Sequence, residues 1–136
     1  MRTQFLKFDG KSQEAFNTAQ LGAVLARRQE YLLRLPFDSN GADVLAYNPE
    51  TLRTTPIQIK SRLSISRKYL GKNLYIAFPI WETESRQAWY LLPHDTLAEL
   101  WGMDKLERHL GWTSGHLSKE MAERLSPYLI GAVDLS

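Results

Sequence analysis

The chain has 136 residues, a net charge of +2 and no cysteine. That length fits one domain, which can bury a core without a disulfide or metal. The absence of cysteine excludes a disulfide framework, a thiolate zinc site and a cysteine nucleophile. No apolar run approaches the ~20 residues that a membrane span needs, and the N-terminus lacks a signal-peptide pattern. We therefore expect a soluble, cytoplasmic protein that does not enter a membrane.

The predicted elements begin with a long helix over residues 11–30, where apolar residues recur at spacings of three and four. Ser12 is its expected N-cap. Short apolar runs bounded by Gly, Pro and Asn predict strands after this helix. These strands cover residues 31–36, 42–47, 55–62, 73–79 and 87–93.

Between and after these strands, turn formers predict a loop over residues 37–41, and residues 63–72 read as a polar, basic connector. A short helix is expected from Asp95 or Thr96 to about Trp101. A second one is expected over 119–125, with Ser118 as its N-cap. Helix, strands and helix in this order predict an α/β fold built around one central sheet.

Charge is concentrated in the middle of the chain. Residues 51–81 contain six Lys and Arg side chains and no Asp or Glu, so this stretch carries +6 and the rest of the chain −4. A cationic stretch on a nearly neutral protein suggests a site for a polyanion such as DNA. A solvated basic loop is the alternative interpretation. The candidate phosphate-binding side chains are Arg62, Arg67, Lys68 and Lys72.

Three polar side chains are expected to converge on one face of the predicted sheet. Gln58 and Lys60 share a face, because side chains alternate along a strand. Asp43 follows a glycine turn on the preceding strand and reaches the same face if the two strands pair. Mg²⁺ prefers oxygen ligands, usually one or two carboxylates with water and phosphate. Candidate ligands of Mg²⁺ or Mn²⁺ are thus Asp43, Gln58 and the carbonyl of Ile59, while Lys60 could hold a water and offset phosphate charge.

This pattern resembles the PD-(D/E)xK nuclease superfamily, in the branch with Gln-x-Lys, and is similar to Holliday-junction resolvase-like and homing-endonuclease-like domains. The resemblance covers about residues 10–100. It is carried by Gly10-Lys-Ser-Gln-Glu14, Gly41-Ala-Asp43 and Ile57-Gln-Ile-Lys-Ser61. It implies a restriction-endonuclease-like αβββαβ core, a central mixed sheet flanked by helices. The catalytic residues that it implies are Glu14, Asp43, Gln58 and Lys60.

The chain departs from the family pattern at two positions. Ala42 stands before the aspartate in place of proline, and Gln58 stands in place of the more usual acid. The loss of one carboxylate should weaken metal binding. Glu14 is the acid that the family pattern selects on the helix, but an acid near a helix start also has a structural explanation, because it is favoured by the helix dipole.

We therefore expect a single nuclease-like domain over 1–136, with a core at about 10–100 and a C-terminal helical extension at about 101–136. The expected activity is metal-dependent DNA endonuclease, hydrolysing phosphodiester bonds. The alternative is a catalytically inactive nuclease-fold module that binds nucleic acid or protein. A core this small offers little DNA footprint alone, so a homodimer is compatible with the prediction.

Overall fold

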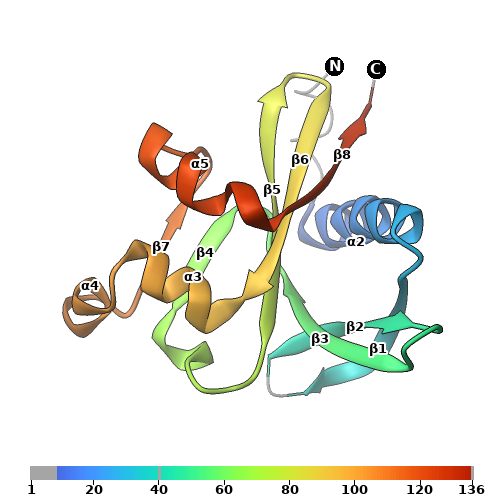
Figure 1. The fold of residues 1–136 in the computed structure, drawn as a ribbon, viewed down its shortest axis with the longest axis horizontal. Coiled ribbons are helices and arrows are strands. Elements are labelled where there is room, and N and C mark those ends of the chain that lie inside the picture. Colours follow the sequence, from blue (N-terminus) through green and yellow to red (C-terminus); the bar gives the residue numbers. More distant parts are fainter. Residues whose placement is uncertain (1–8, 40, 136) are drawn as a thin grey trace.

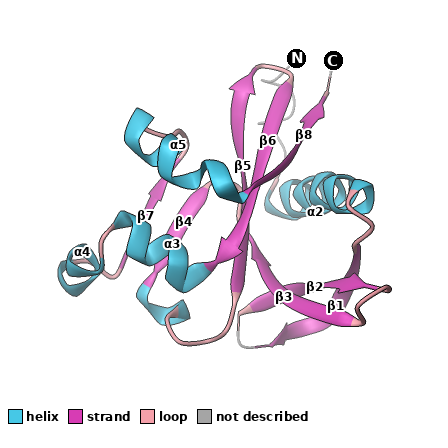
Figure 2. Ribbon diagram, viewed as in Figure 1, coloured by secondary structure: helices cyan, strands magenta, loops and turns pink. Residues whose placement is uncertain are grey.

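The computed structural model describes residues 9–39 and 41–135 of the chain. It is a mixed α/β structure with a six-stranded mixed central sheet, a separate two-stranded sheet and flanking helices (Figures 1 and 2). In chain order the elements are α2 Gly10–Arg27, β1 Tyr31–Ser39, β2 Ala42–Asn48, β3 Arg53–Ile59, β4 Leu63–Ser66, the 3₁₀ helix η1 Arg67–Tyr69, β5 Tyr75–Thr83, β6 Arg86–Pro93, α3 His94–Trp101, α4 Met103–Arg108, β7 Gly111–Ser114, α5 Lys119–Leu125, the 3₁₀ helix η2 Ser126–Tyr128 and β8 Leu129–Asp134.

The central sheet has the strand order β1-β2-β3-β5-β6-β8. β3 and β5 pair in parallel, and the other neighbours pair antiparallel. β1 is an edge strand and continues past Pro36, where the sequence predicted it to end. A proline is tolerated there because its missing N–H can face solvent at an edge. Of the loop predicted over 37–41, residues 37–39 belong to β1, and Asn40 lies outside the described residues.

The predicted long helix is confirmed as α2, but its N-cap differs. The side chain of Asp9, and not of Ser12, closes the helix start, because the Asp9 carboxylate accepts a hydrogen bond from the Ser12 N–H at 2.8 Å. This hydrogen bond favours the ionised carboxylate and lowers the pKa of Asp9. The helix therefore begins three residues earlier than a Ser12 cap would place it.

The crossover between the parallel strands β3 and β5 is not the polar connector that the sequence predicted. Leu63 and Ile65 are buried and alternate with serines, so the segment forms β4, which pairs with β7. The basic residues that follow form only η1. No α-helix lies between β3 and β5, where the αβββαβ order expects one, because two-residue alternation suits a strand and not a helix.

The sheet presents two covered faces. The first, called here the α2 face, shows Val44, Ile57 and Trp89 to the buried side of α2. The second, called the β4 face, shows Ile76 and Phe78 to a layer that contains β4, α3 and α5. In Figure 1, α2 and this second layer lie on opposite sides of β5 and β6.

The segment expected to be a helical extension also contains strands. Ser118 caps α5 as predicted, with its hydroxyl accepting from the Met121 N–H at 3.2 Å. The chain then enters β8, which pairs with β6 at the edge of the central sheet. This strand was missed because Gly131 interrupts its apolar pattern and Pro127 stands just before it. None of the helices within residues 9–39 and 41–135 is long and apolar enough to cross a membrane.

Candidate functional site

The strand register brings three of the predicted polar residues to one face. Val44 lies opposite Ile57 in the β2–β3 pair, and both face α2. Because side chains alternate, the neighbouring Asp43 and Gln58 point to the β4 face. Lys60 continues this alternation one residue beyond β3. Its N–H still donates to the Ala77 carbonyl of β5 at 2.9 Å, which keeps the backbone in line with the sheet.

Asp43 is tied to the end of β3 by a side-chain hydrogen bond. Its Oδ2 accepts from the Ile59 N–H at 3.0 Å. The carboxylate therefore sits at the point where the β2–β3 ladder ends. The N–H and C=O of one strand residue point to the same side, so the Ile59 carbonyl also lies on the β2 side of β3. This arrangement gathers a carboxylate and a carbonyl oxygen at one place.

Gln58 contributes a buried side chain with an incomplete set of hydrogen bonds. The residue is 9% exposed, and its Oε1 is a buried acceptor without a hydrogen-bond partner. An unpaired buried polar atom of this kind costs about 1–3 kcal/mol of stability. Hydrophobic packing does not account for a glutamine at this position, since a leucine or methionine would fill the same space without that cost.

Lys60 lies over an aromatic ring. Its Nζ is 5.5 Å from the ring centroid of Tyr69 in η1, and the Lys68 Nζ is 5.0 Å from the same centroid. The Tyr69 ring can take this position because residue 41 is a glycine. The φ of Gly41 is +92°, and a Cβ added there would lie 2.9 Å from Tyr69 Cε1. The Tyr69 ring therefore packs against the backbone just before Asp43, and the ammonium groups of Lys60 and Lys68 lie over it.

A cavity of about 560 Å³ opens beside these ammonium groups. Its walls include Lys60, Lys68 and Tyr69, together with Ser64 and Ser66 of β4. Asp43 and Gln58 are not among its lining residues. The cavity thus offers cationic and hydroxyl groups next to the carboxylate site, which is a chemistry suited to an anionic group.

A buried histidine contacts both the start of η1 and its tyrosine. His94 is fully buried, its Nε2 accepts from the Ser66 N–H at 3.1 Å, and its ring meets Tyr69 edge-on at 5.5 Å. Burial lowers the pKa of His94, although the nearby Asp95 acts in the opposite direction. The neutral ring with its proton on Nδ1 fits these contacts, because Nε2 must accept. Sequence spacing alone gave no sign of this role.

Glu14 is placed apart from the other three predicted catalytic residues. It is exposed on α2, and its backbone carbonyl accepts from the Thr18 hydroxyl at 2.8 Å. α2 covers the α2 face, whereas Asp43 and Gln58 point to the β4 face. The structure therefore brings Asp43, Gln58 and Lys60 together and leaves Glu14 on the other side of the sheet.

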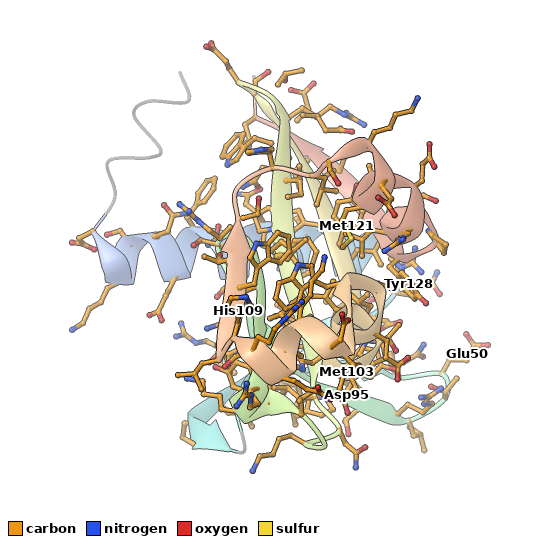
Figure 3. All side chains as sticks on the ribbon, turned by 90° about the vertical axis from the view of Figure 1, so that its left-hand side faces the viewer. Glu50, Asp95, Met103, His109, Met121 and Tyr128 are labelled. Carbon is orange, nitrogen blue, oxygen red and sulfur yellow. The ribbon has the colours of Figure 1, made fainter. Side chains whose placement is uncertain are left out.

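The four basic residues predicted to contact DNA have different environments. Arg67 donates through its guanidinium to the carbonyls of Leu106 and His109, at the end of α4, which Figure 3 marks by the labels Met103 and His109. Arg67 therefore holds α4 against η1, a structural role that the sequence did not reveal. The other three are exposed and lie close in the chain to the Lys60 cavity: Arg62, Lys68 and Lys72.

The donor set for a metal is small. Across residues 9–39 and 41–135, no group of three or more His, Asp or Glu side chains could hold a metal ion. What Asp43 and its neighbours provide is one carboxylate, the unpaired amide oxygen of Gln58 and the Ile59 carbonyl. Comparisons with protein families, with curated proteins and with solved structures find no match for this chain.

Proposed function

We propose that the chain is a metal-dependent nuclease that hydrolyses phosphodiester bonds in DNA, with its site at the ends of β2 and β3. The observation that carries the proposal is the unpaired, buried Oε1 of Gln58 on the same sheet face as Asp43 and Lys60. A lone oxygen acceptor beside a carboxylate is unfavourable by itself and becomes favourable when a cation binds both.

The residues present fit Mg²⁺ or Mn²⁺ in kind, although with less charge than two carboxylates would give. Asp43, Gln58 and the Ile59 carbonyl would hold the ion, with the remaining positions left to water and phosphate. A bound ion of this type lowers the pKa of water and stabilises charge on a phosphoryl group. The order α2-β1-β2-β3 and the parallel pairing of β5 with β3 also agree with the restriction-endonuclease-like core, whereas the missing crossover helix does not.

The chain's own side chains have separate tasks in this proposal. Lys60 offsets the negative charge that develops on the phosphate oxygens and orients the attacking water. Tyr69 fixes the direction of the Lys60 side chain through the ring contact. Lys68 and Ser66, which line the adjoining cavity, bind the neighbouring phosphate of the strand.

A second candidate function is a nuclease-fold module that binds nucleic acid without cutting it. One observation favours this alternative: Glu14 lies on the far side of the sheet, so the site has a single carboxylate. The two functions differ in metal dependence, because phosphate contacts alone need no ion.

A cleavage assay distinguishes the two functions. Linear, supercoiled, single-stranded and branched DNA would be incubated with Mg²⁺, Mn²⁺ or EDTA. The variants Asp43→Asn and Lys60→Met should each lower the metal-dependent rate by about 100-fold or more. The matched controls are Glu50→Gln, an exposed carboxylate at the β2–β3 turn that Figure 3 labels, and Lys119→Met at the start of α5. Salt-sensitive binding without cleavage would support the binding module instead.

A further inference from the structure

We propose that a pocket on the α2 face binds one unpaired nucleobase of a DNA strand. This inference rests on the proposed function for the identity of the strand, but its contacts are separate from the site on the β4 face. The pocket has a volume of about 310 Å³, at the lower end of the range for small-ligand sites. Its walls include Gln13 and Asn17 of α2, Ser61 and Arg62 after β3, Trp81 of β5 and Gln87 of β6.

One of the residues that line the pocket carries a buried hydrogen-bond donor without an acceptor. Gln87 is 1% exposed, and its Nε2 has no partner. The identity of this atom is fixed by its neighbour: the Trp89 indole N–H can only donate, and it donates to Gln87 Oε1 at 3.3 Å. The amide group therefore cannot be reversed, and its NH₂ group is the part that lacks an acceptor within the chain.

The remaining walls suit a flat heterocycle better than a charged or aliphatic ligand. Trp81 lies directly opposite Gln87 in the β5–β6 pair, so an indole ring stands beside the unpaired amide. Gln13 Nε2 donates to Asn17 Oδ1 at 3.2 Å, which keeps the Gln13 carbonyl oxygen available as an acceptor. No carboxylate lines this pocket. Carboxamides that read donor and acceptor edges beside an aromatic ring are the usual means of recognising an unstacked base.

The chain connects this pocket with the proposed nuclease site. Ser61 and Arg62, which line the pocket, follow directly after Lys60. A strand whose phosphate contacts Lys60 on the β4 face would pass the end of β3 at Ser61 and Arg62 to bring a base to the pocket on the α2 face. Since a paired base cannot leave its stack without cost, the pocket favours single-stranded or branched DNA over an intact duplex.

The test compares base-bearing strands with an abasic strand of equal charge. Fluorescence anisotropy in EDTA would measure binding of oligothymidylate and oligoadenylate, each against an abasic sugar-phosphate strand of the same length. The chain should bind at least one base-bearing strand about tenfold more tightly than the abasic strand. Gln87→Met and Trp81→Leu should bring this ratio close to one without changing affinity for the abasic strand. Gln20→Met, the same kind of change on α2 outside the pocket walls, should leave the ratio unchanged.

If Gln87→Met does not fold, a substitution of the half-buried Gln13 serves as a second test. Gln13→Ala should also lower the ratio, because it removes an acceptor from the wall of the pocket. Equal binding of base-bearing and abasic strands by the unaltered chain would overturn the proposal, because a pocket that holds only water would give this result. A ratio of affinities that Gln87→Met or Gln13→Ala leaves unchanged would overturn it as well. Asp43→Asn should retain the base preference, so a failure of the nuclease proposal and a failure of this pocket give different results.

Discussion

Each face of the central sheet buries one glutamine with an unpaired amide atom, and the two atoms are of opposite kind. On the β4 face the unpaired atom is the oxygen of Gln58, while on the α2 face it is the nitrogen of Gln87. An oxygen is completed by a cation or a donor, whereas an NH₂ group is completed by an acceptor. The same residue type therefore leaves different groups unpaired on the two faces, and on the α2 face the Trp89 N–H determines that the nitrogen is the unpaired atom.

The surroundings of the two glutamines strengthen this contrast. Gln58 shares a sheet face with Lys60 and with Asp43, whose carboxylate accepts from the N–H of the next residue, Ile59. Gln87 lies beside the indole rings of Trp81 and Trp89. A carboxylate and an ammonium group thus share the β4 face at the strand ends, whereas the pocket on the α2 face is lined by amides, an indole ring and Arg62, with no carboxylate among its described residues.

The largest expected effect concerns the packing of the α2 face. Trp89 is fully buried beneath α2 and joins the core that includes Leu21 and Val133. Trp89→Ala should lower the free energy of unfolding by about 3–5 kcal/mol, since it creates a cavity. Urea unfolding followed by circular dichroism measures this loss. A loss below about 1 kcal/mol would mean that α2 does not depend on this ring.

The next largest effect concerns the approach of Tyr69 to the β4 face. Gly41→Ala places a Cβ 2.9 Å from Tyr69 Cε1 and forces a non-glycine residue to a φ of +92°. The strain should cost about 1–3 kcal/mol. Gly22→Ala is the matched control, because its Cβ would meet the nearest atom at 3.7 Å within a helix. The control should keep or raise the thermal midpoint, and an equal loss in both variants would contradict this explanation.

A smaller effect separates the two glutamines directly. Gln58→Met removes the unpaired acceptor and should stabilise the fold by about 1 kcal/mol. Gln87→Met removes an unpaired donor but also takes the acceptor from the Trp89 N–H, so it should give no such gain. Chemical denaturation of both variants measures the difference. An equal gain in both would show that the Trp89 hydrogen bond contributes nothing.

The smallest expected effect is a pH dependence of stability through His94. Burial lowers the pKa of His94 in the folded state, so the unfolded chain binds the proton more readily. The stability is complete above the ordinary histidine pKa of about 6.5 and declines as pH falls toward the lower folded value. The groups that face the ring are Asp95, Tyr69 and the Ser66 N–H. His94→Gln, which retains an acceptor, should flatten the decline measured between neutral and mildly acidic pH, and an unchanged slope would assign it to other groups.

The sequence predicted elements with a clear local pattern more fully than elements that depend on a distant partner. Apolar spacing and turn residues were sufficient for α2, β2 and β6, because local patterns specify those elements. β4 was missed because its basic surroundings suggested a solvated connector, although Leu63 and Ile65 alternate with serines. Its partner β7 is distant in the chain, and no local pattern could predict that pairing.

The candidate site was predictable in part for the same reason. Alternation along β3 correctly placed Gln58 and Lys60 on one face, and the β2–β3 pairing brought Asp43 to them. The position of Glu14 depends on which sheet face α2 covers, which the residue spacing does not encode. The roles of Arg67 and His94 depend on contacts with α4 and β4 across the fold.

The most direct test of the central claim is a Mn²⁺ titration, followed by calorimetry or electron paramagnetic resonance, of the unaltered chain and of Asp43→Asn and Gln58→Glu. If Asp43 and the unpaired Gln58 oxygen hold the ion, Asp43→Asn should abolish binding. Gln58→Glu should tighten it, since a second carboxylate replaces a neutral ligand. Identical Mn²⁺ binding by all three proteins, or no binding even by Gln58→Glu, would contradict a metal site at the ends of β2 and β3.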